Sequence, residues 1–307
     1  MLLLKYFLKE ERIMKTSIVI CGVVMLCCVG YAGAAVTWTP IDKAGAYYTE
    51  VLGIDGGTLV GVYSDTMGNH GFSYNSGTWV THDDPAGQTV LYGIDGSNYV
   101  GSYYDNGYRG CSYISSSWNT LDAPGAATGG SKGTFMHGID GGNLVGYYTD
   151  SSDNAHGFLY NGGSWTPIDK PGATQTWIDG ISGSKLVGDY DFHGAVYDMT
   201  GGTWTIHDMS GASSTWINGI SGSNLVGYYE DASGDHGFFY NGTSWTTLDY
   251  PGAAGTYVYG IEGNELVGYY WNNNDGGNAH GFTAIIPEPM TLALLGLGGL
   301  MLRKRKA

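Results

Sequence analysis

The fold is decided by the stretch GISGSNLVGYY at residues 219–229. Its start, a Gly-Ile pair followed by a polar residue and a second Gly, opens six similar segments along the chain. Each segment continues into an apolar run of the type Leu-Val-Gly-Tyr, and the copies are about 41 residues apart, which indicates an internal structural repeat. The other five copies begin at Gly53, Gly93, Gly138, Gly180 and Gly260.

One repeat contains four short strands. Around the copy that begins at Gly219, alternating residues predict strands at 214–220, 224–229, 236–240 and 244–249. Gly222-Ser223 and Asn241-Gly242 supply tight turns between strands. Four strands in a unit of about 40–45 residues is typical of a propeller blade.

The ends of the repeat array predict a closed ring. The sixth copy stops after His280-Gly281-Phe282 and lacks a fourth strand, whereas Trp38-Thr39-Pro40-Ile41-Asp42 resembles the fourth strand at 165–169 and precedes the first copy. We therefore expect an all-β, six-bladed propeller at residues 35–285, closed by the N-terminal strand. Pro40 and Pro167 support this order, because a proline within a strand is tolerated at a sheet edge, where the fourth strand lies.

A tryptophan and an aspartate recur once in each repeat, four residues apart. We expect the Trp residues to fill the same packing gap between blades, with carbohydrate stacking as the alternative. We expect the Asp residues to cap the turn before the Pro-Gly-Ala connection. The pairs are Trp38 and Asp42, Trp79 and Asp83, Trp118 and Asp122, Trp165 and Asp169, Trp204 and Asp208, and Trp245 and Asp249.

The loops between the second and third strands form the candidate ligand face. They are rich in Asp and Asn and should share one face of the ring with the Pro-Gly-Ala connections. Most end in His-Gly, and we expect these His side chains to be held by backbone hydrogen bonds, with a metal or proton-transfer site as the alternative. The candidate ligand residues are His70, Arg109, His156, His193, His236 and His280.

Calcium is the one cofactor that the loops suggest. Asp150 with Asp153, or Asp231 with Asp235, could each supply hard oxygen ligands, although turn formation explains these residues equally well. No catalytic residue is assigned, because catalysis needs an asymmetric constellation. Only the connection at 125–134 and the short loop at 189–191 break the repeat in this interpretation.

The composition excludes nucleic acid as a partner. The chain has a net charge of −15, and phosphate binding needs clustered Lys and Arg. The repeat region contains few basic side chains, and they are Lys43, Arg109, Lys132, Lys170 and Lys185.

The N-terminus predicts export. Lys15, the apolar stretch 18–29 and Ala32-Gly33-Ala34 have the layout of a secretory signal peptide at residues 1–34, with residues 1–13 as an upstream extension. The cysteines at 21, 27 and 28 would be removed with it. Cys111 then remains alone, so the mature chain has no intramolecular disulfide.

The C-terminal segment 286–307 has three parts in a fixed order. Pro287-Glu288-Pro289 precedes an apolar run from Met290 to Leu302, and the basic stop that follows consists of Arg303, Lys304, Arg305 and Lys306. The segment resembles the PEP-CTERM sorting signal of Gram-negative bacteria, which implies recognition by an exosortase-type protease. A transient helical anchor in the inner membrane is expected, with the basic stop on the cytoplasmic side.

The repeats resemble the HAF-type repeats of bacterial surface proteins, as in Leu144-Val145-Gly146-Tyr147-Tyr148 followed by His156-Gly157-Phe158. This resemblance implies an exported β-repeat protein without catalytic residues. Together with the tail, it implies a cell-surface or exopolysaccharide-matrix protein of a biofilm. We therefore expect a non-catalytic binding or structural propeller with polysaccharide or another surface component as partner. The alternative is a secreted propeller enzyme that acts on glycans, a lyase or a glycosidase.

Overall fold

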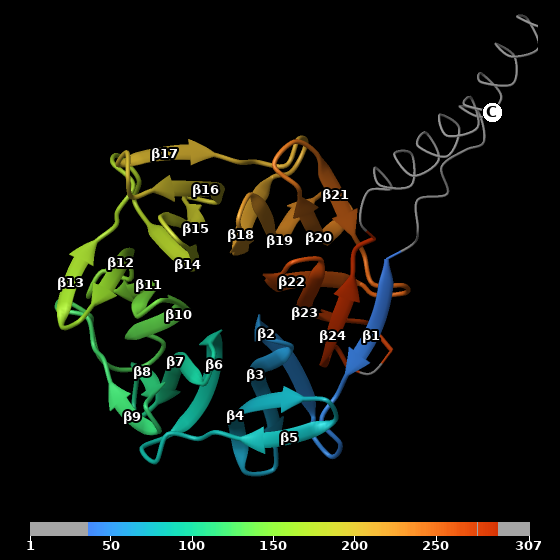
Figure 1. Cartoon of the computed structure of the whole chain (residues 1–307), viewed down its shortest axis with the longest axis horizontal. Helices are drawn as coiled ribbons and strands as arrows, with labels where there is room; N and C mark the ends of the chain where they lie inside the picture. The colour runs from blue at the N-terminus through green and yellow to red at the C-terminus, as the bar shows by residue number, and fades with distance from the viewer. Residues whose placement is uncertain (1–35, 275, 288–307) are drawn as a thin grey trace, which may run out of the picture. The chain divides into compact units, whose positions relative to one another are not determined.

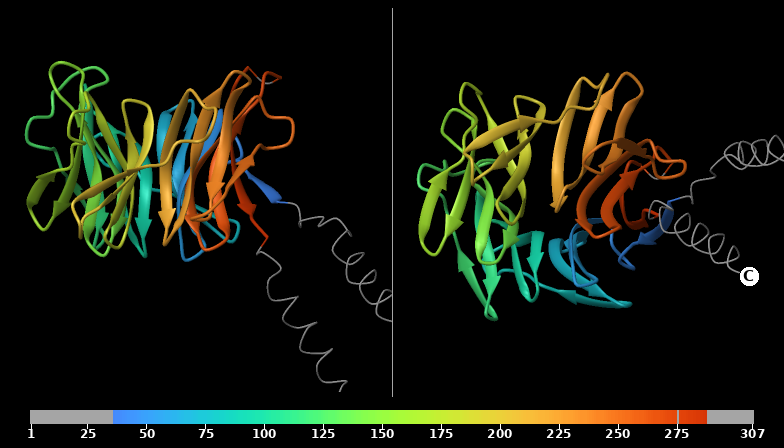
Figure 2. Two further views of the ribbon diagram at one scale, coloured as in Figure 1. Left: turned by 90° about the horizontal axis from the view of Figure 1, so that it is seen from above. Right: turned by 45° about the horizontal axis from the view of Figure 1, so that its top comes forward.

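A computed structural model describes residues 36–274 and 276–287, of which Thr37–Ile286 form one compact unit. This unit contains six four-stranded antiparallel sheets arranged as blades around a central axis (Figure 1). Figure 2 shows the ring edge-on, with the loops between strands on its two faces. The prediction of an all-β, six-bladed propeller is therefore confirmed.

The strands of each blade are given in order from the axis outward. Blade 1 consists of β2 (Tyr48–Asp55), β3 (Thr58–Asp65), β4 (Gly68–Asn75) and β5 (Thr78–Thr81), and blade 2 of β6 (Gln88–Asp95), β7 (Asn98–Tyr104), β8 (Tyr108–Ile114) and β9 (Ser117–Thr120). Blade 3 consists of β10 (Thr134–Asp140), β11 (Asn143–Thr149), β12 (Ala155–Asn161) and β13 (Ser164–Pro167), and blade 4 of β14 (Thr176–Ser182), β15 (Lys185–Tyr190), β16 (His193–Asp198) and β17 (Thr203–Ile206). Blade 5 consists of β18 (Ser214–Ser221), β19 (Asn224–Asp231), β20 (Gly234–Tyr240) and β21 (Trp245–Leu248), and blade 6 of β22 (Gly255–Glu262), β23 (Glu265–Trp271), β24 (Ala279–Ile285) and β1 (Thr37–Ile41).

The N-terminal strand closes the ring, as the sequence predicts. Strand β1 pairs antiparallel with β24, with Trp38 opposite Ala284 and Ile41 opposite Gly281. Because β1 is the outermost strand of blade 6, Pro40 lies on a sheet edge, as expected.

A second connection passes from blade to blade through the acidic residue of the Gly-Ile motif. Asp55 Oδ2 accepts a hydrogen bond of 2.7 Å from the backbone N–H of Gly96, which lies in the first hairpin turn of the next blade. Asp95 accepts in the same way from Gly141. Glu262 of blade 6 accepts from Gly56 N at 3.0 Å, so this series also joins the last blade to the first.

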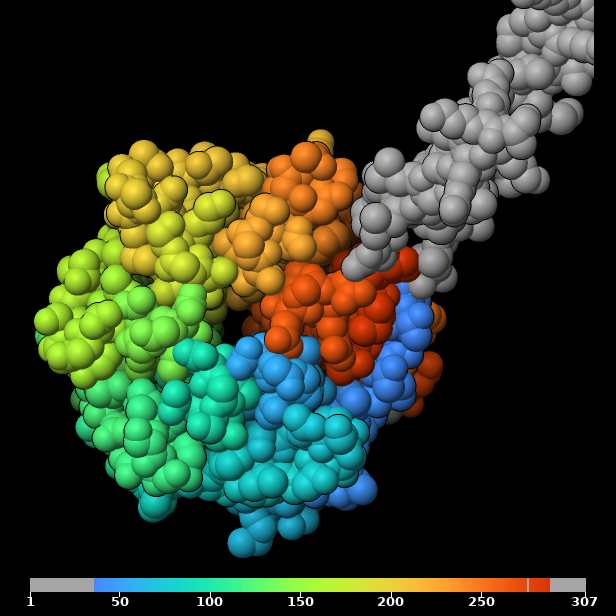
Figure 3. Space-filling model, viewed as in Figure 1, coloured from blue at the N-terminus to red at the C-terminus, as the bar shows by residue number. Residues whose placement is uncertain are grey.

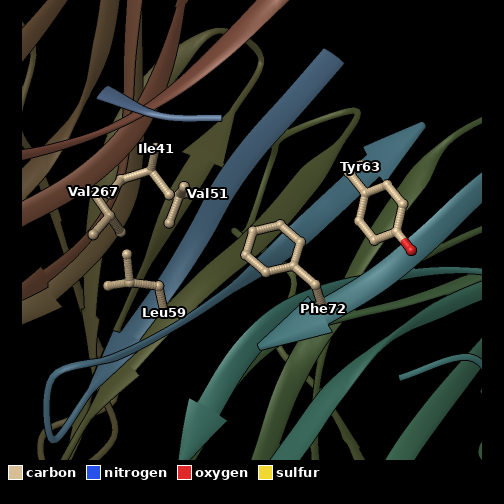
Figure 4. Packing of buried hydrophobic residues seen from close by; sticks show 6 residues of the cluster. All are labelled: Ile41, Val51, Leu59, Tyr63, Phe72 and Val267. Atoms are coloured by element: carbon tan, nitrogen blue, oxygen red, sulfur yellow. The ribbon is translucent and has the colours of Figure 1, made fainter. Parts of the chain in front are cut away.

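The core lies between neighbouring blades. Figure 4 shows one such cluster, in which Ile41 and Val267 of blade 6 meet residues of blade 1. The Val of each Leu-Val-Gly segment is fully buried, as Val60, Val145 and Val226 illustrate. Complete burial of an apolar side chain of this size stabilises the fold by about 1.5–3 kcal/mol.

The recurring Trp residues pack within their own blade as well as against the neighbouring blade. Trp79 contacts the rings of Phe72 and Tyr74, and Trp245 contacts those of Phe238 and Tyr240, at 4.7–4.8 Å between centroids. These partners lie on the third strand of the same blade. Trp38 of blade 6 also lies edge-on to Tyr250, which follows the last strand of blade 5, at 5.3 Å between centroids. Trp79 packs against the cluster that contains Ile41 and Val267 of blade 6, so the Trp series also contributes to packing between blades, as expected.

Each innermost strand contains one β-bulge, and the bulge falls at the residue before the Gly-Ile motif. The six bulge residues form what we call the bulge ring, and they are Leu52, Tyr92, His137, Asp179, Asn218 and Tyr259. The glycine that follows permits close approach of the blades, since a Cβ on Gly53 would lie 2.6 Å from Tyr92 O. Bulges of this kind re-aim side chains, and here all six line the central channel.

The predicted targeting segments lie outside the described residues. They comprise the signal peptide at 1–34, Glu288 and Pro289 of the sorting motif, and the basic stop from Arg303 to Lys306; Pro287 is the last described residue. Within the described part of the chain, no helix is long and apolar enough to cross a membrane.

Candidate functional site

The candidate ligand residues all lie on one face of the ring, one in each blade, near the start of the third strand. Each one pairs with the recurring Asp that follows the fourth strand, and we call these six the edge pairs. His70 Nδ1 lies 2.7 Å from Asp83 Oδ2, and Arg109 Nε donates to Asp122 Oδ2 at 2.7 Å. The other edge pairs, at 2.9–3.0 Å, are His156 with Asp169, His193 with Asp208, His236 with Asp249, and His280 with Asp42.

The edge pairs correct two expectations. The His rings are held by carboxylates and not by backbone groups, and a Tyr of the second strand stacks on most of them, as Tyr63 does on His70 at 5.0 Å. The second oxygen of Asp83 accepts from the backbone N–H of Gly71, so the Asp joins two strands and does not cap the Pro-Gly-Ala turn. A contact repeated in every blade is a structural device; ligand binding by this face stays a prediction.

Three edge pairs carry a further acid. Asp65 Oδ1 lies 3.3 Å from His70 Nε2, and Asp150 and Asp231 take the same position beside His156 and His236. Burial lowers the pKa of His70, but Asp83 and Asp65 outweigh this and leave the pKa above its ordinary value.

The residues suggested for calcium have other partners. Asp150 Oδ1 accepts the backbone N–H groups of residues 152 and 154, and these hydrogen bonds hold its pKa below the ordinary value. Asp153 pairs with Lys132 at 2.9 Å, and Asp235 accepts from the hydroxyl of Tyr257 at 2.6 Å. In the described ranges, no group of three or more His, Cys, Asp or Glu side chains is arranged to hold a metal ion. Calcium binding stays a prediction.

A cavity of about 190 Å³ lies on the axis of the ring, and we call it the axial cavity. Figure 3 shows the central opening in the molecular surface. The walls of the axial cavity come from blades 3 to 6 and combine polar and aromatic groups. The lining residues are His137, Tyr147, Trp177, Asp179, Asp189, Trp216, Asn218, Tyr228 and Tyr259.

The axial cavity contains an asymmetric constellation, and of its residues only Asp189 belongs to a segment, 189–191, that the sequence marks as breaking the repeat. The bulge ring places unlike residues at one position of the repeat, so neighbouring blades bring different groups into contact. His137 Nδ1 of blade 3 lies 2.8 Å from Asp179 Oδ1 of blade 4, and Tyr92 of blade 2 stacks on the His137 ring at 4.1 Å. Asn218 donates to the Val258 carbonyl at 2.8 Å.

Two acids with raised pKa values lie on inner strands of the ring. Asp189, on the second strand of blade 4, is 3% exposed, and burial together with the charges of Asp179 and Asp191 raises its pKa well above the ordinary value. On the first strand of blade 1, burial raises the pKa of Glu50 to about 7. Glu50 occupies the repeat position that Trp177 and Trp216 occupy in blades 4 and 5.

A second hollow, of about 320 Å³, lies between blades 4 and 5, and we call it the outer cleft. Blade 4 contributes Lys185, Asp198 and His207, and blade 5 contributes Tyr240. His207 follows the fourth strand at a position where blades 6, 3 and 5 have the buried aliphatic residues Ile41, Ile168 and Leu248. Burial, aided by Lys185, lowers the pKa of His207.

No family model matches this chain, and no curated protein matches it. A protein of unknown function from Dyadobacter fermentans shares the fold, with 12% identity and a TM-score of 0.54 over 82% of this chain and 99% of that chain. A lectin from Aleuria aurantia, in complex with α-methyl-L-fucoside, has 15% identity and a TM-score of 0.46 over 80% of this chain and 98% of that chain. An acylaminoacyl peptidase from Pyrococcus horikoshii has 10% identity and a TM-score of 0.42 over 87% of this chain and 54% of that chain. The first likeness supports the propeller fold, and the other two carry no argument about this chain.

Proposed function

We propose that this chain is an exported cell-surface or exopolysaccharide-matrix protein whose propeller binds saccharide without catalysing a reaction. Export and sorting by an exosortase-type protease are supported by the signal-peptide layout and by Pro287-Glu288-Pro289 in the sequence. Cell fractionation tests this part, because a Glu288→Ala variant is expected to stay with the inner membrane.

The outer cleft is the observation that carries saccharide binding. Its volume of about 320 Å³ falls in the range of small-molecule sites, which combine an apolar wall with a few polar groups. Tyr240 supplies an aromatic ring, and the hydroxyls of Thr203 and Thr205 with the neutral imidazole of His207 supply donors and acceptors. Sugars present both apolar C–H faces and hydroxyl groups, so this lining fits them.

A glycan array probed with the full-length protein, with calcium and with chelator, tests saccharide binding. We expect saturable binding that His207→Ala weakens by about fivefold, the loss typical of one hydrogen bond. His82→Ala is the matched control, because His82 has the same place in blade 1 but its Nε2 is bonded to Ser73 Oγ at 2.9 Å. Loss of binding with chelator would restore the calcium prediction, and silence on every glycan would refute the saccharide-binding proposal.

A glycan-cleaving enzyme is the second candidate, and the acids of the axial cavity favour it. Glycosidases pair a carboxylic acid of raised pKa with a second carboxylate, and Asp189 and Asp179 line one cavity. The test is the release of reducing ends from a panel of polysaccharides. If the protein releases them and Asp189→Asn does not, the proposal of non-catalytic binding is replaced by that of a glycan-cleaving enzyme. Binding without release would exclude this candidate for the panel used.

A further inference from the structure

The axial cavity is lined by two acidic side chains and by no Lys or Arg. Asp179 and Asp189 line it, beside His137 and Asn218, and the other five lining side chains are aromatic. The Lys and Arg side chains of the described residues all lie elsewhere, and they are Lys43, Arg109, Lys132, Lys170 and Lys185. An anionic ligand would therefore meet no Lys or Arg, whereas a cationic ligand would meet two carboxyl groups.

Two buried atoms of residues that line the cavity lack hydrogen-bond partners. Asp189 Oδ2 and His137 Nε2 are buried, and neither has a partner among the described residues. Buried polar atoms are nearly always hydrogen-bonded. In a neutral imidazole whose Nδ1 donates to the Asp179 carboxylate, Nε2 is an acceptor, and the Asp189 oxygen accepts when ionised. In these states both atoms can accept hydrogen bonds, so a ligand that donates hydrogen bonds would satisfy them.

The aromatic walls suit the same kind of ligand. Trp216 stacks on Tyr228 at 4.6 Å, and Trp177 lies edge-on to Tyr147 at 6.4 Å. Aromatic faces attract cations through the negative potential of the ring, and the attraction is strongest where water is excluded. An apolar body attached to a cationic head would contact these rings.

We propose that the axial cavity binds a protonated primary amine, with Asp189 and Asp179 as counter-charges, His137 as acceptor, and the Trp177 and Trp216 rings as walls. The cavity of about 190 Å³ limits the ligand to roughly one six-membered ring. Such an amine is either a free alkylamine or the amino group of a sugar unit. This site is separate from the outer cleft, so it stands or falls independently of saccharide binding there.

Binding of the amine is linked to ionisation of Asp189. The groups that face Asp189 are Asp179 with its partner His137, Asp191, and the hydroxyls of Tyr147 and Tyr228. Burial and the neighbouring acids favour the protonated Asp189 in the free protein, so the amine must displace a proton at low pH. Affinity therefore rises with pH and levels off above the raised pKa of Asp189.

Titration of the full-length protein with cyclohexylamine, followed by tryptophan fluorescence and calorimetry, tests the proposal. The neutral isostere cyclohexanol is expected to bind at least about tenfold more weakly, because it lacks the charge. From about pH 5 to about pH 8, where the amine stays protonated, affinity for cyclohexylamine should increase. D-glucosamine and chitosan oligomers, compared with their N-acetylated forms, distinguish an amino-sugar source from a free amine.

Asp189→Asn should weaken cyclohexylamine binding by about tenfold and remove most of the pH dependence. Asp105→Asn is the matched control, because Asp105 lies in an exposed loop between β7 and β8 and its loss changes the net charge equally. Equal affinity for cyclohexylamine and cyclohexanol, a flat pH profile in the unaltered protein, or no binding of any amine would each overturn the proposal. These three results are obtained with the unaltered protein, so the proposal remains testable even if Asp189→Asn does not fold.

Discussion

His137 and Asp179 occupy the same position of the repeat in neighbouring blades, and this equivalence brings them within 2.8 Å. A ring places the six equivalents of any axial position close together, so unlike residues there form one site. At a position on the rim, such as the edge pairs, equivalents stay far apart and six separate sites result. The axial cavity is therefore the place where a single substitution in one repeat can change what the whole ring does.

The sequence contains the signal for the axial cavity at the residue before each Gly-Ile motif. Leu52, Tyr92, His137, Asp179 and Asn218 differ in charge and size at a point where the flanking residues are alike. The motif can be recognised in the sequence because it recurs, whereas the residue before it varies and is therefore easily overlooked. That these side chains face the axis depends on a bulge, which alternation of apolar and polar residues does not predict.

Glu50 makes the stability of the propeller depend on pH. Its pKa is raised from 4.5 to about 7 by burial, so the folded chain holds a proton that the unfolded chain releases. The stabilisation is complete below the unfolded pKa and is lost as pH rises through about 7. Glu50→Gln should remove about 3 kcal/mol of the fall in unfolding free energy between about pH 4 and about pH 8.

Urea denaturation at both pH values measures this difference, and Glu230→Gln is the control because Glu230 is exposed. Asp189 contributes a fall of the same sign, so the comparison of the two Glu variants isolates Glu50. An equal pH dependence in Glu50→Gln and the unaltered protein would contradict the assignment.

The repeat pattern predicts which strands form, but it does not predict where the strands end or how the turns between them are built. Strands were expected at 224–229 and 236–240, with a loop between, yet β19 runs to Asp231 and β20 starts at Gly234. The turn tightens because Asp231 Oδ1 accepts the backbone N–H of Ser233 at 2.7 Å. The edge pairs were missed for a similar reason. The His or Arg lies on the third strand and its Asp just after the fourth strand, and only the register of the two strands brings them together.

The glycine of each Leu-Val-Gly segment is required by the strand opposite. A Cβ on Gly227 would overlap the carbonyl oxygen of Trp216 on β18, whereas a Cβ on Gly222 in the hairpin turn meets nothing within 4 Å. Gly227→Ala should therefore destabilise the fold by about 3 kcal/mol or more. Gly222→Ala is the matched control and should cost about 1 kcal/mol, because it strains only a φ of +63°. Denaturant titration of both variants checks the order, and similar costs would contradict the close approach of β18 and β19.

For the whole molecule, the pairing between the first and last strands of the repeat array closes the ring. The sequence predicted six blades and closure by β1 because the array has a fourth strand at its start and lacks one at its end. Strand β1 contributes the buried Ile41 to the core between blades 6 and 1, and it covers the edge of β24. An uncovered edge of this kind promotes self-association.

Deletion of residues 37–41 should lower the unfolding free energy by about 3 kcal/mol or more, since it removes a buried side chain and a ladder of hydrogen bonds. A circular permutant gives the control, because Ile285 and Thr37 face each other across the sheet as Asn75 and Thr78 do around a two-residue turn. Joining Ile285 to Thr37 through Ser-Gly, and opening the chain before Lys43, keeps every strand pair. We expect this permutant to stay within about 1 kcal/mol of the original propeller, the scale of a change in loop closure. If denaturation shows the permutant to be as unstable as the deletion, then the covalent link from β1 to blade 1, and not its pairing with β24, holds the ring closed.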